Sequence, residues 1–126
     1  MSVISFNPLK IGPVEISNRV VLAPMSGVSD LPFRRLASRF GVGLVVSEMV
    51  ASREMLRNSR QSARRMLFER DAGPVSIQLA GTEPEIMADA ARFAVDRGAE
   101  LIDINFGCPA KKVVKKATGS ALMRDV

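Results

Sequence analysis

The chain has 126 residues, which is enough for one domain with a hydrophobic core and too few for two. Apolar residues make up 47% of the chain and charged residues 25%, a composition that is ordinary for a globular protein and excludes a disordered one. The net charge of +5 at pH 7 favours a polyanionic partner such as RNA, or an anionic cofactor, although the same charge also serves solubility.

The chain is predicted to begin with a β-hairpin over residues 6–18, because apolar and polar residues alternate on both sides of Gly12-Pro13. The next apolar run, Arg19–Ala23, predicts a first main strand, which Pro24 ends.

A helix is expected next, and Ser29 or Asp30 can cap its amino end. Gly41 is its expected carboxyl-terminal stop. Arg34 and Arg35 are interpreted as solvated residues of this helix. Its packing face is expected to consist of Leu36, Ala37 and Phe40.

Three further apolar runs predict the second, third and fourth main strands. They lie at Gly43–Ser47, Val75–Leu79 and Glu100–Ile104.

The segments between these strands are mostly helical in pattern. Residues 51–58 predict a short helix, and residues 66–68 a minor strand. Thr82 and Glu85 are expected to form a capping box, in which a hydroxyl at the N-cap is followed three residues on by a carboxylate. The helix after them ends at Gly98. Its packing stripe is formed by Ile86, Met87, Ala90, Ala91, Ala94 and Val95.

Four strand-helix units in series predict an α/β fold with a parallel sheet and helices outside it. An open doubly wound sheet and a (β/α)8 TIM barrel compete, and the phosphate-binding Gly-x-Gly-x-x-Gly of the open fold is absent after the first strand. Functional-looking residues instead follow each strand, as at the rim of a barrel. They are Pro24, Met25, Ser47, Glu48, Gln78, Asp103 and Asn105.

A whole barrel takes roughly 250 residues, so residues 1–126 are interpreted as the N-terminal half of a TIM-barrel domain, preceded by the hairpin. A half-barrel leaves open strand edges that invite pairing with another chain. We therefore expect either that the chain is a truncated part of a longer protein or that it self-associates through those edges.

The chain contains one cysteine, Cys108, so an internal disulfide is excluded. This thiol follows the fourth strand and has lysines nearby, and reactive thiols occur in such surroundings. No metal site is predicted. The N-terminus lacks the features of a secretory signal and no apolar stretch approaches about 20 residues, so we expect a cytoplasmic protein without a membrane span.

Four segments resemble the signature sequences of the tRNA-dihydrouridine synthases, and most closely those of the bacterial B-type branch. Their order and spacing agree with that family from Phe6 onward, which is more specific than any one motif. The segments are Ala23-Pro-Met-Ser-Gly-Val-Ser-Asp-Leu-Pro-Phe-Arg34, Ser47-Glu-Met49, Val75-Ser-Ile-Gln-Leu-Ala-Gly81 and the stretch from Asp103 to Met123.

The resemblance implies an FMN-dependent flavoprotein that passes a hydride to C6 of a uridine in tRNA, with NADPH re-reducing the flavin. Cys108 matches the cysteine that gives a proton to C5, and a thiol is mostly protonated at pH 7 and can act as an acid. Asn105 is implied to bond the target uracil, and Lys111 and Lys112 to contact tRNA phosphates. The implied FMN contacts are Pro24, Met25, Ser26 and Gln78.

The sequence also departs from the family pattern. The family often has glycine where Ala117 stands, and alanine prefers a negative φ, so we expect the local turn to differ slightly. Later strands of the family supply further flavin contacts, and a helical domain binds tRNA, so the chain alone is expected to be inactive. Two alternatives stay open: another barrel flavoprotein such as a dihydroorotate dehydrogenase, and a non-catalytic half-barrel that self-associates.

Overall fold

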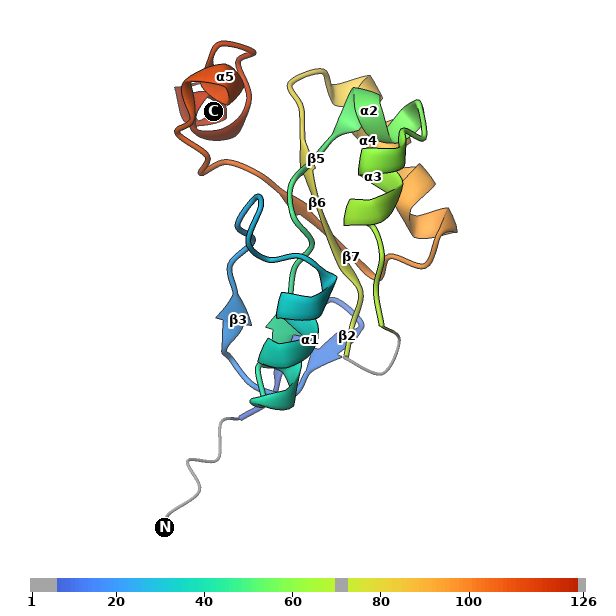
Figure 1. The fold of residues 1–126 in the computed structure, drawn as a ribbon, viewed down its shortest axis with the longest axis vertical. Coiled ribbons are helices and arrows are strands. Elements are labelled where there is room, and N and C mark those ends of the chain that lie inside the picture. Colours follow the sequence, from blue (N-terminus) through green and yellow to red (C-terminus); the bar gives the residue numbers. More distant parts are fainter. Residues whose placement is uncertain (1–6, 70–72, 125–126) are drawn as a thin grey trace.

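The computed structural model describes residues 7–69 and 73–124 of an α/β protein (Figure 1). The predicted hairpin is confirmed: β1 (Leu9–Ile11) pairs antiparallel with β2 (Val14–Ile16). Ile16 is fully buried and packs with Leu44 and Val46, so the hairpin closes the lower end of the core.

All main strands run parallel. β3 (Val21–Leu22) pairs with β4 (Leu44–Val45). β5 (Val50–Ala51), β6 (Ser76–Ala80) and β7 (Leu101–Ile104) form a three-stranded sheet in that order.

A single bridge between Val46 and Ser76 connects the two parallel sheets, so neighbouring strands follow the order of the chain. The strands therefore end on the same side, which confirms the predicted parallel α/β series. The sequence predicted β3 and β4 as longer strands and did not predict β5 as a separate one.

Helix α1 (Leu31–Arg39) begins at the predicted cap, because the Asp30 carboxylate accepts a hydrogen bond from the Phe33 amide at 3.0 Å. Gly41 follows its last turn with φ 85°, the left-handed conformation that favours glycine. Its predicted packing face is wrong. Leu36 and Phe40 are 53% and 82% exposed in this chain.

Arg34 is the buried residue of α1, at 2% exposure, so its interpretation as solvated is also wrong. Its guanidinium donates to the carbonyl oxygens of Ser29 and Leu67 at 3.1 and 3.0 Å and lies over the Phe68 ring. Burial lowers its pKa, and the negative charges of Glu48 and Asp30 oppose that effect. Two carbonyls and an aromatic face thus replace part of the water around the cation, while its Nη1 has no hydrogen-bond partner among the described residues.

Two short helices replace the single predicted segment after β5. They are α2 (Ser52–Leu56) and α3 (Arg60–Arg65), and the Ser59 hydroxyl caps α3 by accepting from the Ser62 amide. The minor strand predicted at residues 66–68 is wrong. This segment instead places Met66 and Phe68 against the core, so their apolar pattern reflects packing without strand pairing.

Helix α4 (Pro84–Asp96) covers the β5–β7 sheet together with α2 and α3 (Figure 1). The predicted capping box is wrong, since the N-cap is Glu83 and makes no side-chain capping bond. The stripe is correct at Ala90 and Ala94, which are 0% and 1% exposed, and wrong at Val95, which is 54% exposed. The main core beneath it consists of Val50, Met55, Ile77, Leu79, Ala90, Ala94 and Ala99.

The chain then crosses to α5 (Lys111–Val114) and a 3-10 helix at Gly119–Arg124, which lie beyond the carboxyl ends of the strands (Figure 1). Ala117 between them has φ 54°. The turn therefore adopts the left-handed conformation that suits glycine, despite the alanine. Among the described residues, none of the helices has the length and apolar character that crossing a lipid bilayer requires.

Candidate functional site

A cavity of about 560 Å³ opens where the parallel strands end. Of the predicted site residues, it brings together Pro24, Ser26, Gln78, Asn105 and Cys108. Met25, Lys111 and Lys112 do not line it. The remaining lining residues are Met49, Asp103, Ile104, Phe106, Gly107 and Pro109.

Three side chains on β6, on β7 and just after β7 form a continuous hydrogen-bonded chain within this cavity. Gln78 Nε2 donates to Asp103 Oδ2 at 2.5 Å. Asn105 Nδ2 donates to Gln78 Oε1 at 3.0 Å and contacts Met49 Sδ at 3.2 Å. Gln78 and Asn105 are 7% and 8% exposed, so the bonds satisfy groups that water scarcely reaches.

The same asparagine holds the backbone of the cysteine loop. Asn105 Oδ1 accepts from the amides of Gly107 and Cys108 at 3.1 and 3.0 Å. Its amide group is therefore fully engaged within the protein, and contact with a uracil stays a prediction.

Cys108 is held from both sides of its peptide unit. Its amide donates to Asn105, and its carbonyl oxygen accepts from the Ser120 amide at 3.1 Å. Gly119 packs closely beneath this carbonyl, where a side chain would have no room. Cys108 is half-buried and lines the cavity wall, so its backbone is fixed while the residue remains partly accessible.

The loop that contains Pro24 to Ser26 is held in place by three residues that were not predicted as site residues. Glu48, 8% exposed, accepts from the Gly27 amide through Oε1 at 2.7 Å. Ser29 accepts from the Met25 amide at 2.7 Å, and Arg34 donates to the Ser29 carbonyl. Glu48 follows a buried strand in the sequence, and that position was the available signal for its role.

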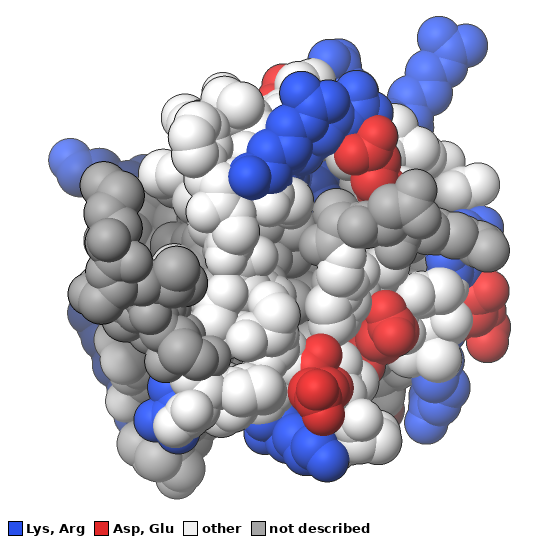
Figure 2. All heavy atoms as spheres, turned by 90° about the horizontal axis from the view of Figure 1, so that it is seen from below, with Lys and Arg blue, Asp and Glu red and all other residues white. Residues whose placement is uncertain are grey.

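The lysines of α5 lie outside the cavity. Lys111, Lys112, Lys115 and Lys116 are all exposed, and none forms an ion pair within the described part of the chain. Figure 2 shows a different face of the molecule, seen from below. There the basic side chains lie near the edges, with acidic side chains among them. A second basic group in the sequence, Arg60, Arg64 and Arg65, lies on α3, a separate region in Figure 1. Arg70, which follows this group in the sequence, is outside the described residues.

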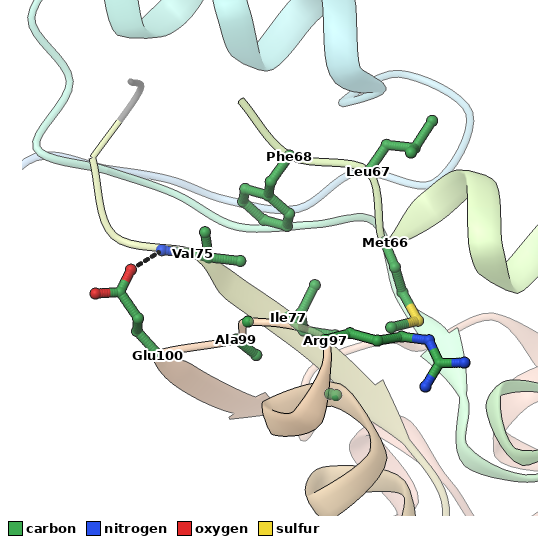
Figure 3. A pocket seen from close by; sticks show the side chains of 10 residues that line it. Met66, Leu67, Phe68, Val75, Ile77, Arg97, Ala99 and Glu100 are labelled. Atoms are coloured by element: carbon green, nitrogen blue, oxygen red, sulfur yellow. Dashed lines mark hydrogen bonds between the residues drawn. The ribbon is translucent and has the colours of Figure 1, made fainter. Parts of the chain in front are cut away.

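A second cavity of about 380 Å³ lies near the start of β6 and β7, away from Cys108. Met66, Phe68 and Ile77 give it apolar walls, and Glu100 accepts from the Val75 amide at 2.9 Å at its edge (Figure 3). The Glu100 carboxylate thus bonds to the backbone. The described residues that line this cavity offer packing surface without a nucleophile. The cavity containing Cys108 is the stronger candidate.

Comparison with known proteins assigns the family of the chain. A family profile described as Dihydrouridine synthase (Dus) matches residues 21–126. A probable tRNA-dihydrouridine synthase of Rickettsia bellii is 58% identical over 118 residues, which cover 93% of this chain and 36% of the relative. The tRNA-dihydrouridine synthase B of Pseudomonas aeruginosa is 54% identical over 117 residues, covering 93% and 35%. That of Vibrio vulnificus is 51% identical over 116 residues, covering 92% and 36%.

The chain spans about a third of the length of these relatives, with 36% of the Rickettsia bellii protein matched. The matched region contains the loop at Pro24, both amide residues of the cavity and Cys108.

Proposed function

The chain belongs to the dihydrouridine synthase family, and we propose that it carries the proton-donating side of an active site that reduces uridine in tRNA to 5,6-dihydrouridine. The observation that carries this proposal is the placement of Cys108. Its backbone is bonded on both sides, and the residue lines an open cavity together with residues from three other segments. A positioned thiol of this kind is suited to proton delivery.

We further propose that residues 1–126 form the N-terminal half of a TIM barrel. The support is the series of parallel strands that neighbour one another in chain order, with the candidate site at their carboxyl ends. β3 and β7 are the outer strands of this series. Further strands of a barrel would pair with them, or a second copy of the chain would do so.

The cavity suits part of a flavin. Its volume is within the range of cofactor sites, roughly 300–1,000 Å³. Gln78 retains one amide hydrogen and one lone pair beyond its bonds to Asp103 and Asn105, so it could bond the imide edge of a ring. Pro24 and Ser26 offer main-chain groups on the opposite wall. Within the described part of the chain, the lining contains no lysine or arginine to hold a phosphate, so we expect weak cofactor affinity from these residues alone.

When bound, FMN would supply the hydride for C6 of uridine, with NADPH as its reductant. Cys108 would give its thiol proton to C5, so that one hydride and one proton saturate the C5–C6 double bond. Asn105 would hold the loop that presents the thiol, through the Gly107 and Cys108 amides. The exposed lysines of α5 would meet tRNA phosphates in the cytoplasm.

A chimera tests this function. The matched region of the Pseudomonas aeruginosa relative is replaced by this chain, and dihydrouridine is measured in tRNA from cells that otherwise lack it. We expect the chimera to restore the modification. Changing Cys108 to alanine or serine should lower the rate by at least about 100-fold, the usual contribution of a general acid, with the flavin still bound.

The controls separate catalysis from folding. Serine matches the cysteine in shape, so a loss in both variants with unchanged thermal unfolding assigns the loss to the acid. The 126-residue chain alone should leave tRNA unmodified and purify without flavin absorbance. A chimera that folds and binds flavin yet leaves tRNA unmodified would count against the proposal, as would full activity without the thiol.

A further inference from the structure

Among the residues that the structure describes, Asp103 is the one charged side chain in the wall of the candidate cavity. It is the direct neighbour of Gln78 across the parallel pair β6–β7, so their side chains leave the sheet on the same face. We propose that Asp103 is a positioning residue. Through Gln78 and Asn105 it sets the direction of the hydrogen bonds that place Cys108, an assignment that rests on the proposed function for its catalytic meaning.

The side chains of this hydrogen-bonded chain differ in what they can donate or accept. An ionised carboxylate only accepts, whereas a primary amide has a donor side and an acceptor side and can be turned either way. Asp103 therefore requires Gln78 to present its NH2 group, and this turns Gln78 Oε1 toward Asn105. Asn105 must therefore donate to that oxygen through its own NH2 group.

The far end of the chain imposes the same direction. Gly107 and Cys108 present backbone N–H groups, which only donate, so Asn105 must offer them its carbonyl oxygen. The reversed arrangement would set the Asn105 NH2 group against two N–H groups and the Gln78 oxygen against a carboxylate. Fixed acceptors at one end and fixed donors at the other thus select a single orientation for both amides.

Burial makes this selection effective. With Gln78 and Asn105 only 7% and 8% exposed, water is not free to satisfy a reversed amide. An apolar residue at position 103 removes the fixed acceptor, so Gln78 is held only through Asn105 and becomes more mobile. Asn105 keeps the direction that the Gly107 and Cys108 amides require, but it loses a rigid partner, so its bonds to both amides weaken.

The test uses the full 126-residue chain and two variants. Asp103→Asn keeps a carbonyl acceptor for Gln78, whereas Asp103→Leu has similar size and no acceptor. Amide hydrogen exchange is followed at Gly107 and Cys108. We expect Asp103→Leu to speed exchange at both by about fivefold, the effect of one hydrogen bond, and Asp103→Asn to stay close to the parent. The Asn105 amide, bonded to the Leu79 carbonyl, reports whether the sheet is intact.

Alkylation of the single thiol supplies a second readout that needs neither flavin nor tRNA. Its rate should change in Asp103→Leu and return toward the parent rate in Asp103→Asn. If Asp103→Leu does not fold, Gln78→Leu interrupts the same chain one step later and should give the same exchange pattern. Parental exchange at Gly107 and Cys108 in a folded Asp103→Leu or Gln78→Leu chain would overturn the inference.

The chimera keeps this test distinct from the proposed function. Asp103→Leu should reduce tRNA modification there, and Asp103→Asn should restore most of it. An inactive parent chimera alongside the expected exchange pattern would remove the proposed function and leave the positioning role standing. An active parent chimera, with parental exchange in both Asp103 variants, would support the proposed function and remove the positioning role of Asp103.

Discussion

Gly119 offers a sharp test of how the cysteine loop is built. It has φ 63°, and a Cβ atom there would lie 2.6 Å from the Cys108 carbonyl oxygen and 2.9 Å from Val113 Cγ1. Gly12 in the hairpin has nearly the same conformation, φ 57°, and nothing within 4 Å of the equivalent position. The two glycines therefore share a backbone requirement and differ in the space around them.

The expected magnitudes follow from this difference. A left-handed conformation costs an alanine about 1–2 kcal/mol, and the reduced freedom of the unfolded chain returns about 0.4–1 kcal/mol. Gly12→Ala should thus lower the free energy of unfolding by about 1 kcal/mol. Gly119→Ala adds an overlap with backbone that should cost a further 1–3 kcal/mol or so, giving about 2–4 kcal/mol in all.

Denaturant unfolding of both variants measures the two free energies, and alkylation of Cys108 reports on the site. We expect altered thiol reactivity only in Gly119→Ala, because relief of the overlap must move the Cys108 carbonyl or the turn that bonds it. Equal destabilisation of the two variants, with parental alkylation in both, would refute the claim that Gly119 supports the cysteine.

Two further predictions concern the same end of the molecule. Ala117→Gly should stabilise the chain by about 0.5–1 kcal/mol in denaturant unfolding, because Ala117 has φ 54°; a destabilisation would contradict that conformation. The double substitution Lys111→Gln with Lys112→Gln should weaken tRNA binding and reduce the slope of log affinity against log salt by about 1–2. The matched control, Arg60→Gln with Arg64→Gln on α3, should leave that slope nearly unchanged. Equal slopes for the two pairs would show that the α5 lysines have no special part.

Local sequence signals predicted the elements that depend on local chemistry. The Asp30 cap, the Gly41 stop and the hairpin turn at Gly12 each follow from the conformation or bonding of a few adjacent residues. The capping box failed for a related reason. Pro84 occupies the first helical position, the helix begins after Glu83, and the hydroxyl of Thr82 therefore falls outside the cap.

Predictions failed where distant contacts decide the outcome. Arg34 resembles any charged residue on a short helix. Besides the nearby Ser29 carbonyl, its guanidinium contacts the Leu67 carbonyl and the Phe68 ring, more than thirty positions away, which the sequence could not reveal. Leu36 and Phe40 show the converse, because their apolar face has no partner among the described residues. In a complete barrel, such a face on an outer helix would be covered by a neighbouring helix.

In the candidate site, local signals predicted the positions of the residues, and distant contacts decided their roles. The sequence placed Gln78, Asp103 and Asn105 at strand ends, and the parallel register then makes Gln78 and Asp103 neighbours. It could not assign roles to them, because an amide has the same donors and acceptors whether it faces a ligand or another side chain. The structure shows that much of this capacity is used internally, between a carboxylate and the backbone of Cys108. The placement of the thiol therefore depends on side chains from two strands as well as on its own loop, and a matching Cys-Pro motif without an acceptor at position 103 would not reproduce it.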